Sequence, residues 1–154
     1  SMRRMIFAAA LFAATLPASM CGAQDSDFAL FSQIDNAIGS VSQETARDSH
    51  AACLEIGKKV AARSGMSPLM RLYFESQVES CIALAMNHGG YSDDSGDQCS
   101  HQFAHAAKLA ELIEQAGTHD VYASQLPQYR EKLESAAQLG EGMKCEQDFA
   151  AFKG

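Results

Sequence analysis

The segment Cys99–His105, with the sequence CSHQFAH, combines a cysteine with two histidines at spacings that could support chemistry. His101 and His105 are four positions apart, so on a helix their imidazoles lie one turn apart and could bind Zn²⁺ or Cu²⁺. Two ligands alone make a weak, open site, and a third ligand would have to come from another part of the chain. The candidates for it are His88, His119, Asp93, Asp94 and Asp97.

A helical wheel separates the cysteine from the two histidines. With Phe103 taken as the direction of the core, Cys99 falls on the buried side, whereas His101 and His105 fall near the opposite pole. We therefore expect Cys99 to point inward and both histidines to face solvent or a partner. Metal binding by this pair is an alternative interpretation, and the leading one requires no cofactor.

The acidic segment Tyr91–Asp97, with the sequence YSDDSGD, precedes this helix. Its carboxylates would suit Ca²⁺, but the spacing of an EF-hand loop is missing. Negative charge just before a helix N-terminus is favourable, which explains the segment without a metal. In a binding protein we expect a mobile acidic loop with an aromatic anchor to contact the partner. The predicted partner-binding residues are Tyr91, Asp93, Asp94, Asp97, His101 and His105.

Enzyme signatures are missing from the sequence, which contains no GxSxG, HExxH, P-loop or GxGxxG motif. His50 follows the same apolar stripe as Cys53, a placement typical of a hydrogen-bonded core histidine. Glu75 and Glu79 are one helical turn apart, a spacing that ordinary solvated helix faces share. We therefore assign no catalytic residue and expect no enzyme, with a small secreted hydrolase as the second alternative.

The N-terminus has the layout of a secretory signal peptide. Two arginines, twelve apolar residues and a stretch of small residues follow one another before Ala23. The apolar run is shorter than the roughly 20 residues that cross a bilayer as a helix. Methionine is a poor residue before a lipobox cysteine, which argues against a lipid anchor at Cys21. We take Ser1 as an added residue and predict a signal peptide over residues 1–23, hence a periplasmic or secreted protein.

The remaining chain, residues 24–154, is predicted to form a single domain. Loss of the leader removes two arginines and no acidic residue, so the formal net charge changes from −7 to −9. Nucleic acid and anionic membranes repel so acidic a chain, whereas a basic protein partner would attract it. No later stretch is apolar enough to cross a membrane.

Four cysteines remain in this domain, an even number that predicts two disulfides in an oxidising compartment. Cys53 and Cys81 lie equally far from the predicted turn between two helices, so antiparallel packing would bring them together. Cys99 and Cys145 are similarly placed about a later break. We expect these two pairs; the pairing of Cys81 with Cys99 and of Cys53 with Cys145 stays open as the alternative.

Apolar residues recur with a helical period along the domain, and the turn residues divide it into helices. The predicted fold is all-α: a compact antiparallel bundle of four main helices, with short terminal helices and two disulfides. The predicted helices cover 27–39, 40–64, 68–88 and 99–115, then 120–126 and 127–139, and a last short one carrying Cys145, Phe149 and Phe152.

Together these patterns predict a small exported, non-enzymatic protein-binding module of the inhibitor, immunity or chaperone type. That functional expectation follows from the class of protein and from no specific motif. The first alternative is a periplasmic metal-binding protein that uses His101 and His105, and the second is the small hydrolase.

Overall fold

The computed structural model describes residues 26–153 and shows an all-helical domain. The predicted signal peptide, residues 1–23, lies outside the described residues. Within residues 26–153, no helix combines the length and the apolar character that a membrane span requires. The elements are α2 (Asp27–Gly39), α3 (Ala46–Ala62), α4 (Pro68–Gly89), α5 (Gln98–Ala116), α6 (Asp120–Ala123), α7 (Leu126–Gly142) and the 3₁₀ helix η1 (Phe149–Phe152).

Local capping residues set most of these helix ends. The side chains of Ser26, Ser67 and Asp97 cap α2, α4 and α5, each accepting a hydrogen bond from the backbone N–H three residues further on. Gly90 ends α4 in the left-handed conformation, with φ of 64°. The predicted boundaries of these three helices are therefore close to the observed ones.

The helix predicted from Ser40 begins instead at Ala46, and this boundary was wrong. Ser40 is the C-cap of α2, and its backbone N–H makes the last helical hydrogen bond, to the carbonyl of Asn36. The next residues form a turn in which the hydroxyls of Ser42 and Thr45 lie 2.9 Å apart and Thr45 Oγ1 donates to the Ser40 carbonyl at 2.6 Å. Such side-chain hydrogen bonds compete with the helical ones, so α3 starts only after the turn.

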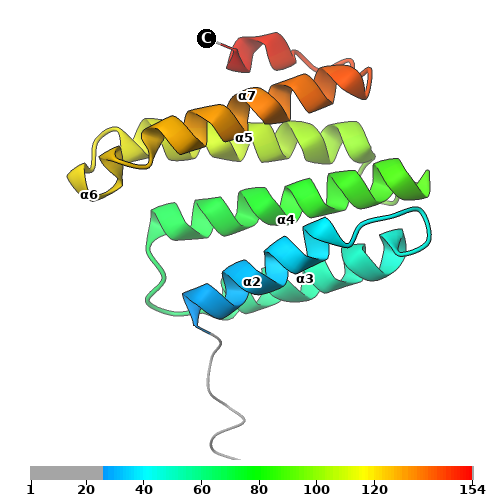
Figure 1. The fold of residues 1–154 in the computed structure, drawn as a ribbon, viewed down its shortest axis with the longest axis horizontal. Helices are drawn as coiled ribbons and strands as arrows, with labels where there is room; N and C mark the ends of the chain where they lie inside the picture. Colours follow the sequence, from blue (N-terminus) through cyan, green and yellow to red (C-terminus); the bar gives the residue numbers. More distant parts are fainter. Residues whose placement is uncertain (1–25, 154) are drawn as a thin grey trace, which may run out of the picture.

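Helix α4 is the central element of the bundle (Figure 1). Helices α2 and α3 pack on one side of it, and α5 packs on the other and carries α7 and η1. One hydrophobic cluster, which includes Phe74 and Cys81, joins α4 to α2 and α3. A second cluster, which includes Leu69, joins α4 to α5, α7 and η1. Helix α4 is shared because apolar residues lie nearly all round it, as expected of an interior helix.

The two disulfides have the predicted pairing. Cys53 in α3 is bonded to Cys81 in α4, with a Cα–Cα distance of 6.3 Å. Cys99 in α5 is bonded to Cys145, with a Cα–Cα distance of 5.4 Å. Cys145 lies in the connection between α7 and η1, not in a helix as expected. Each disulfide therefore links elements within one half of the bundle, and the α4–α5 contact between the halves depends on packing and polar pairs.

Candidate functional site

A groove between α2 and α7 contains two adjoining cavities. Its floor is formed by α4 and α5, and its walls come from α2 and α7. The larger cavity, here called the polar pocket, has a volume of about 510 Å³. The smaller one, the aromatic pocket, has a volume of about 170 Å³. Gln128 and Lys132 of α7 line both cavities, so the two pockets lie next to each other along the groove.

The aromatic pocket is built from ring contacts between three helices. The ring centroids of Phe31 and Tyr73 are 5.4 Å apart, and those of Tyr73 and Tyr129 are 6.1 Å apart. Lys132 Nζ lies 6.0 Å from the centroid of the Tyr73 ring. Rings at these separations attract each other and a nearby cation, so the pocket walls are held in position. The remaining lining residues are Leu69, Met70, Tyr122, Gln125 and Gln128.

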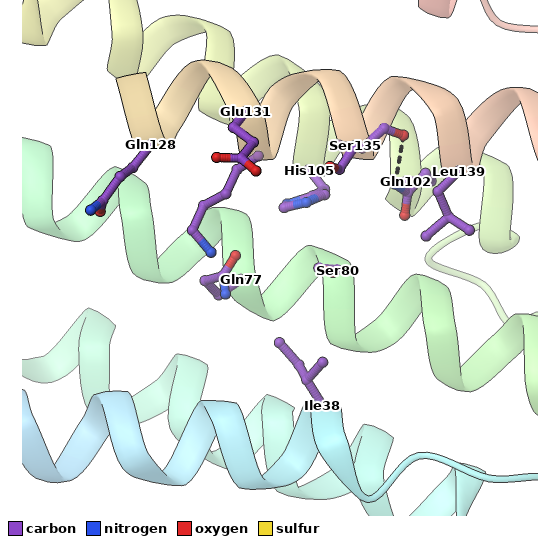
Figure 2. A pocket seen from close by; sticks show the side chains of 11 residues that line it. Ile38, Gln77, Ser80, Gln102, His105, Gln128, Glu131, Ser135 and Leu139 are labelled. Atoms are coloured by element: carbon purple, nitrogen blue, oxygen red, sulfur yellow. Dashed lines mark hydrogen bonds between the residues drawn. The ribbon is translucent and has the colours of Figure 1, made fainter. Parts of the chain in front are cut away.

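Gln102 lies at the floor of the polar pocket and is completely buried. Its Nε2 donates to the carbonyl oxygen of Ala136 at 2.9 Å, and this contact fixes the amide orientation because a carbonyl can only accept. Gln102 Oε1 has no hydrogen-bond partner within residues 26–153. Figure 2 shows this oxygen on the side away from α7, facing the space above α4. A buried acceptor without a donor is costly and calls for an explanation.

His105 supplies a second acceptor on the same floor, three residues further along α5. Its Nδ1 lies 2.8 Å from the carbonyl oxygen of Ser76 and 2.7 Å from Ser76 Oγ, and this hydroxyl donates its own proton to the His105 carbonyl oxygen at 3.1 Å. Nδ1 therefore carries a proton, because the Ser76 carbonyl can only accept, and Nε2 has a lone pair. Burial, aided by the charge of Lys132, lowers the pKa of His105 to about 4. The ring is therefore neutral at neutral pH, and in Figure 2 it projects into the space between α4 and α7.

The expected outward orientation of the two histidines was wrong, because His101 and His105 are each only 7% exposed. Helix α5 packs against α4 and α7 on different sides, so its buried sector is wider than a single apolar stripe. A wheel with one core direction therefore assigns the second buried side to solvent. Leu112, which is fully buried, falls on the same side as the histidines and was the sequence signal for this second face.

His101 connects two helices and the acidic loop. Its Nδ1 lies 2.6 Å from Glu79 Oε2 in α4, and its Nε2 lies 2.9 Å from Ser95 Oγ. The hydrogen bond that His101 donates to Glu79 raises the pKa of His101 despite burial, with help from nearby carboxylates. Ser95, His101 and Glu79 therefore stand in the order of a nucleophile, a base and an orienting carboxylate. Sequence reasoning did not find this arrangement, because no motif relates the three positions.

The way in which these side chains share their protons favours a structural role, in which they form a clasp that holds the acidic loop. Ser95 Oγ also lies within hydrogen-bond distance of Asp93 Oδ1. When His101 is charged, both ring nitrogens donate, one to Glu79 and one to the Ser95 hydroxyl, and the hydroxyl proton goes to Asp93. The serine then has no base to accept its proton. In this state the four residues hold the acidic loop onto α4 and α5.

Tyr91 is integrated into the loop and does not project as an anchor. Its hydroxyl lies 2.8 Å from His50 Nδ1, and the guanidinium carbon of Arg47 lies 4.0 Å from its ring centroid. His50 is buried and hydrogen-bonded, as expected of a core histidine. A Cβ on Gly89 would lie 2.7 Å from the Tyr91 ring, so glycine allows this close packing.

The loop carboxylates are exposed, but two of them stabilise local turns. Asp93 accepts hydrogen bonds from the side chain and the backbone of Ser95, and Asp97 accepts them from the backbone and side chain of Ser100. These hydrogen bonds lower the pKa of both aspartates. The loop expected to be mobile is thus tied at several points, and its charges are held in place.

Within residues 26–153, no group of three or more His, Cys, Asp or Glu side chains is arranged to hold a metal ion. His101 and His105 use their Nδ1 atoms for different partners, Glu79 and the Ser76 carbonyl. Comparisons with protein-family models, with curated proteins and with solved structures find no match for this chain.

Proposed function

We propose that this protein is an exported, non-enzymatic binding module that holds a segment of a protein partner in the groove between α2 and α7. The observation that carries the proposal is that the aromatic and polar pockets adjoin each other at Gln128 and Lys132. Binding sites typically combine apolar walls with a few oriented polar groups, and this groove has both. Two disulfides are compatible with an oxidising compartment outside the cytosol.

A polypeptide segment suits the shape of this groove. The aromatic pocket, at about 170 Å³, has room for one apolar side chain. The polar pocket beside it can take a neighbouring polar side chain of the same segment. The groove also lies between two helices, so a partner can dock there without the bundle opening.

The charge of the chain favours a basic partner. The formal net charge is −7, and the acidic loop lies at the end of the bundle where α2 and α7 terminate (Figure 1). Exposed charges of one sign steer a partner of the opposite sign and raise its association rate. We therefore assign the exposed carboxylates of the loop a role in steering, while the groove provides the contact.

Peptide display on the full-length protein tests the proposal. Selected peptides should lose about tenfold or more in affinity for the variants Tyr129→Ala and Met70→Ala, which remove contacts in the aromatic pocket. Leu54→Ala is the matched control, because Leu54 is an apolar residue of α3 outside the groove and is 46% exposed. Peptides that bind all three variants equally, or that lose affinity only for Leu54→Ala, would contradict the proposal.

Esterase-type hydrolysis is the second candidate, favoured by the alignment of Ser95, His101 and Glu79. A fluorophosphonate probe tests it, because an activated serine oxygen displaces fluoride and forms a stable bond to phosphorus. The clasp interpretation expects Ser95 to remain unlabelled in the wild type and in Asp93→Asn, which removes the competing carboxylate. Labelling of Ser95 that is lost in His101→Gln would establish the hydrolase instead.

A further inference from the structure

We infer that the polar pocket selects a carboxamide, the side-chain group of asparagine or glutamine, on the docked segment. The inference rests on the proposed function, since it names which side chain of that segment enters the polar pocket. It starts from two acceptors on the pocket floor: Gln102 Oε1, which is buried, and Nε2 of His105, a residue that is only 7% exposed.

Gln102 is the stronger of the two observations. A fully buried glutamine could satisfy both ends of its amide within the protein, but within residues 26–153 only Nε2 of Gln102 has a partner. A hydrophobic residue of the same size would fill the space without leaving an unpaired oxygen. The retained oxygen is best explained by a donor that arrives with a ligand, since a donor removes the cost of the unpaired acceptor.

His105 provides a second acceptor on the pocket floor, which also needs a hydrogen-bond donor from a ligand. Gln102 and His105 are three residues apart on α5 and therefore lie on one helix face. The Ser76 carbonyl holds the proton on Nδ1, and Nε2 then presents a lone pair. A ligand group that satisfies this floor must supply two hydrogen-bond donors.

A carboxamide meets this requirement better than the other side-chain groups. Its nitrogen carries two donors for the floor, and its oxygen can accept from Lys132 at the rim. A carboxylate has no donor for either acceptor. An ammonium or guanidinium group could pair with Glu131 of the same pocket, but it would also lie near the like charge of Lys132, and burying a charge costs more than burying a neutral group. A hydroxyl has one donor and leaves one acceptor unpaired.

The test uses three small probes that differ only in the side-chain group: the N-methylamides of N-acetylglutamine, N-acetylglutamate and N-acetyllysine. Each is titrated to millimolar concentration against the full-length protein, and the Gln102 side-chain amide and His105 ring signals are followed by NMR. We expect saturable shifts with the glutamine probe, at about tenfold or higher affinity than with the other two. The absence of a shift with the glutamine probe, or equal affinity for all three, would overturn the inference.

Gln102→Met is the decisive variant, because methionine keeps the volume and removes the acceptor. We expect it to fold with an unchanged or higher unfolding midpoint and to lose the preference for the glutamine probe. The control is Gln138→Met, which removes the amide of an exposed α7 glutamine that lines neither pocket and should retain the preference. Unchanged preference in Gln102→Met would refute the inference.

The two proposals fail in distinguishable ways. If selected peptides depend on Tyr129 but bind Gln102→Met normally, the groove is the docking site and the carboxamide inference is wrong. If the glutamine probe binds at Gln102 but no selected peptide depends on Tyr129, the docking proposal fails.

Discussion

Acid should destabilise the fold through His105. The pKa of this buried ring is lowered from 6.5 to about 4 in the folded protein, mainly by burial. As the pH falls, the unfolded chain therefore takes up a proton before the folded protein does. The stabilisation is complete above pH 6.5, decreases as the pH falls towards about 4, and changes no further below that.

The size of the effect follows from the same two pKa values. One pKa unit corresponds to about 1.4 kcal/mol, so the separation between 6.5 and about 4 corresponds to about 3 kcal/mol of unfolding free energy. Solvent screens this ring little, because His105 is only 7% exposed. A loss of this size is a large fraction of the stability of a typical domain.

His105→Asn isolates this contribution. Asparagine keeps an N–H donor for the Ser76 carbonyl and does not titrate. Urea unfolding is measured at several pH values in the wild type, in His105→Asn and in His88→Asn, which removes an exposed histidine at the end of α4. We expect the wild type and His88→Asn to lose about 3 kcal/mol more than His105→Asn between pH 6.5 and about 4. Parallel curves for all three proteins would refute the reasoning.

Three further predictions concern packing, the clasp and the acidic loop. Gly140→Ala should cost about 1–3 kcal/mol in urea unfolding, because its Cβ would lie 2.5 Å from the Phe149 ring. Gly142→Ala should not destabilise, because among the described residues its Cβ would meet no atom within 4 Å beyond its own stretch of helix. Glu79→Gln should lower the pKa of His101, measured by NMR titration, and should reduce stability more below pH 6.5 than above the raised pKa. A His101 pKa that does not fall, or a stability loss that is larger above the raised pKa than below pH 6.5, would contradict the ion pair. Replacing Asp93, Asp94 and Asp97 by asparagine should slow the association of a basic selected peptide, most strongly at low salt in stopped-flow measurements. An unchanged association rate would exclude the loop from steering.

Interactions between near neighbours in the chain could be predicted because they depend on local chemistry. Ser26, Ser67 and Asp97 cap helices wherever those helices pack, so their roles follow from residue type and position. The pairing of Cys53 with Cys81 could also be predicted from the sequence, because two antiparallel helices joined by a tight turn bring together positions that are equally far from the turn. The start of α3 was predicted wrongly, at residue 40, because the serine and threonine of a turn are also residue types that cap a helix.

The burial of His101 and His105 could not be read from one helical stripe. Their environment depends on α4 and α7 packing against different sides of α5, and a single core direction cannot represent two packing faces. The clasp among Ser95, His101 and Glu79 was missed for a related reason. A hydrogen bond between a loop and two helices depends on angstrom-scale placement, which residue spacing does not encode.

The sequence by itself determined the all-α class and the helix ends with strong caps, and it favoured the two disulfide pairings that the structure has, because each depends on residues near one another in the chain or nearly symmetric about a turn. Only the tertiary structure decided where a groove would open and which polar atoms would lie unpaired within it. Gln102 illustrates the difference: its burial and its unpartnered oxygen arise from α4, α5 and α7 together. Such a site is a property of how helices pack, and packing joins residues whose separation in the chain carries no signal.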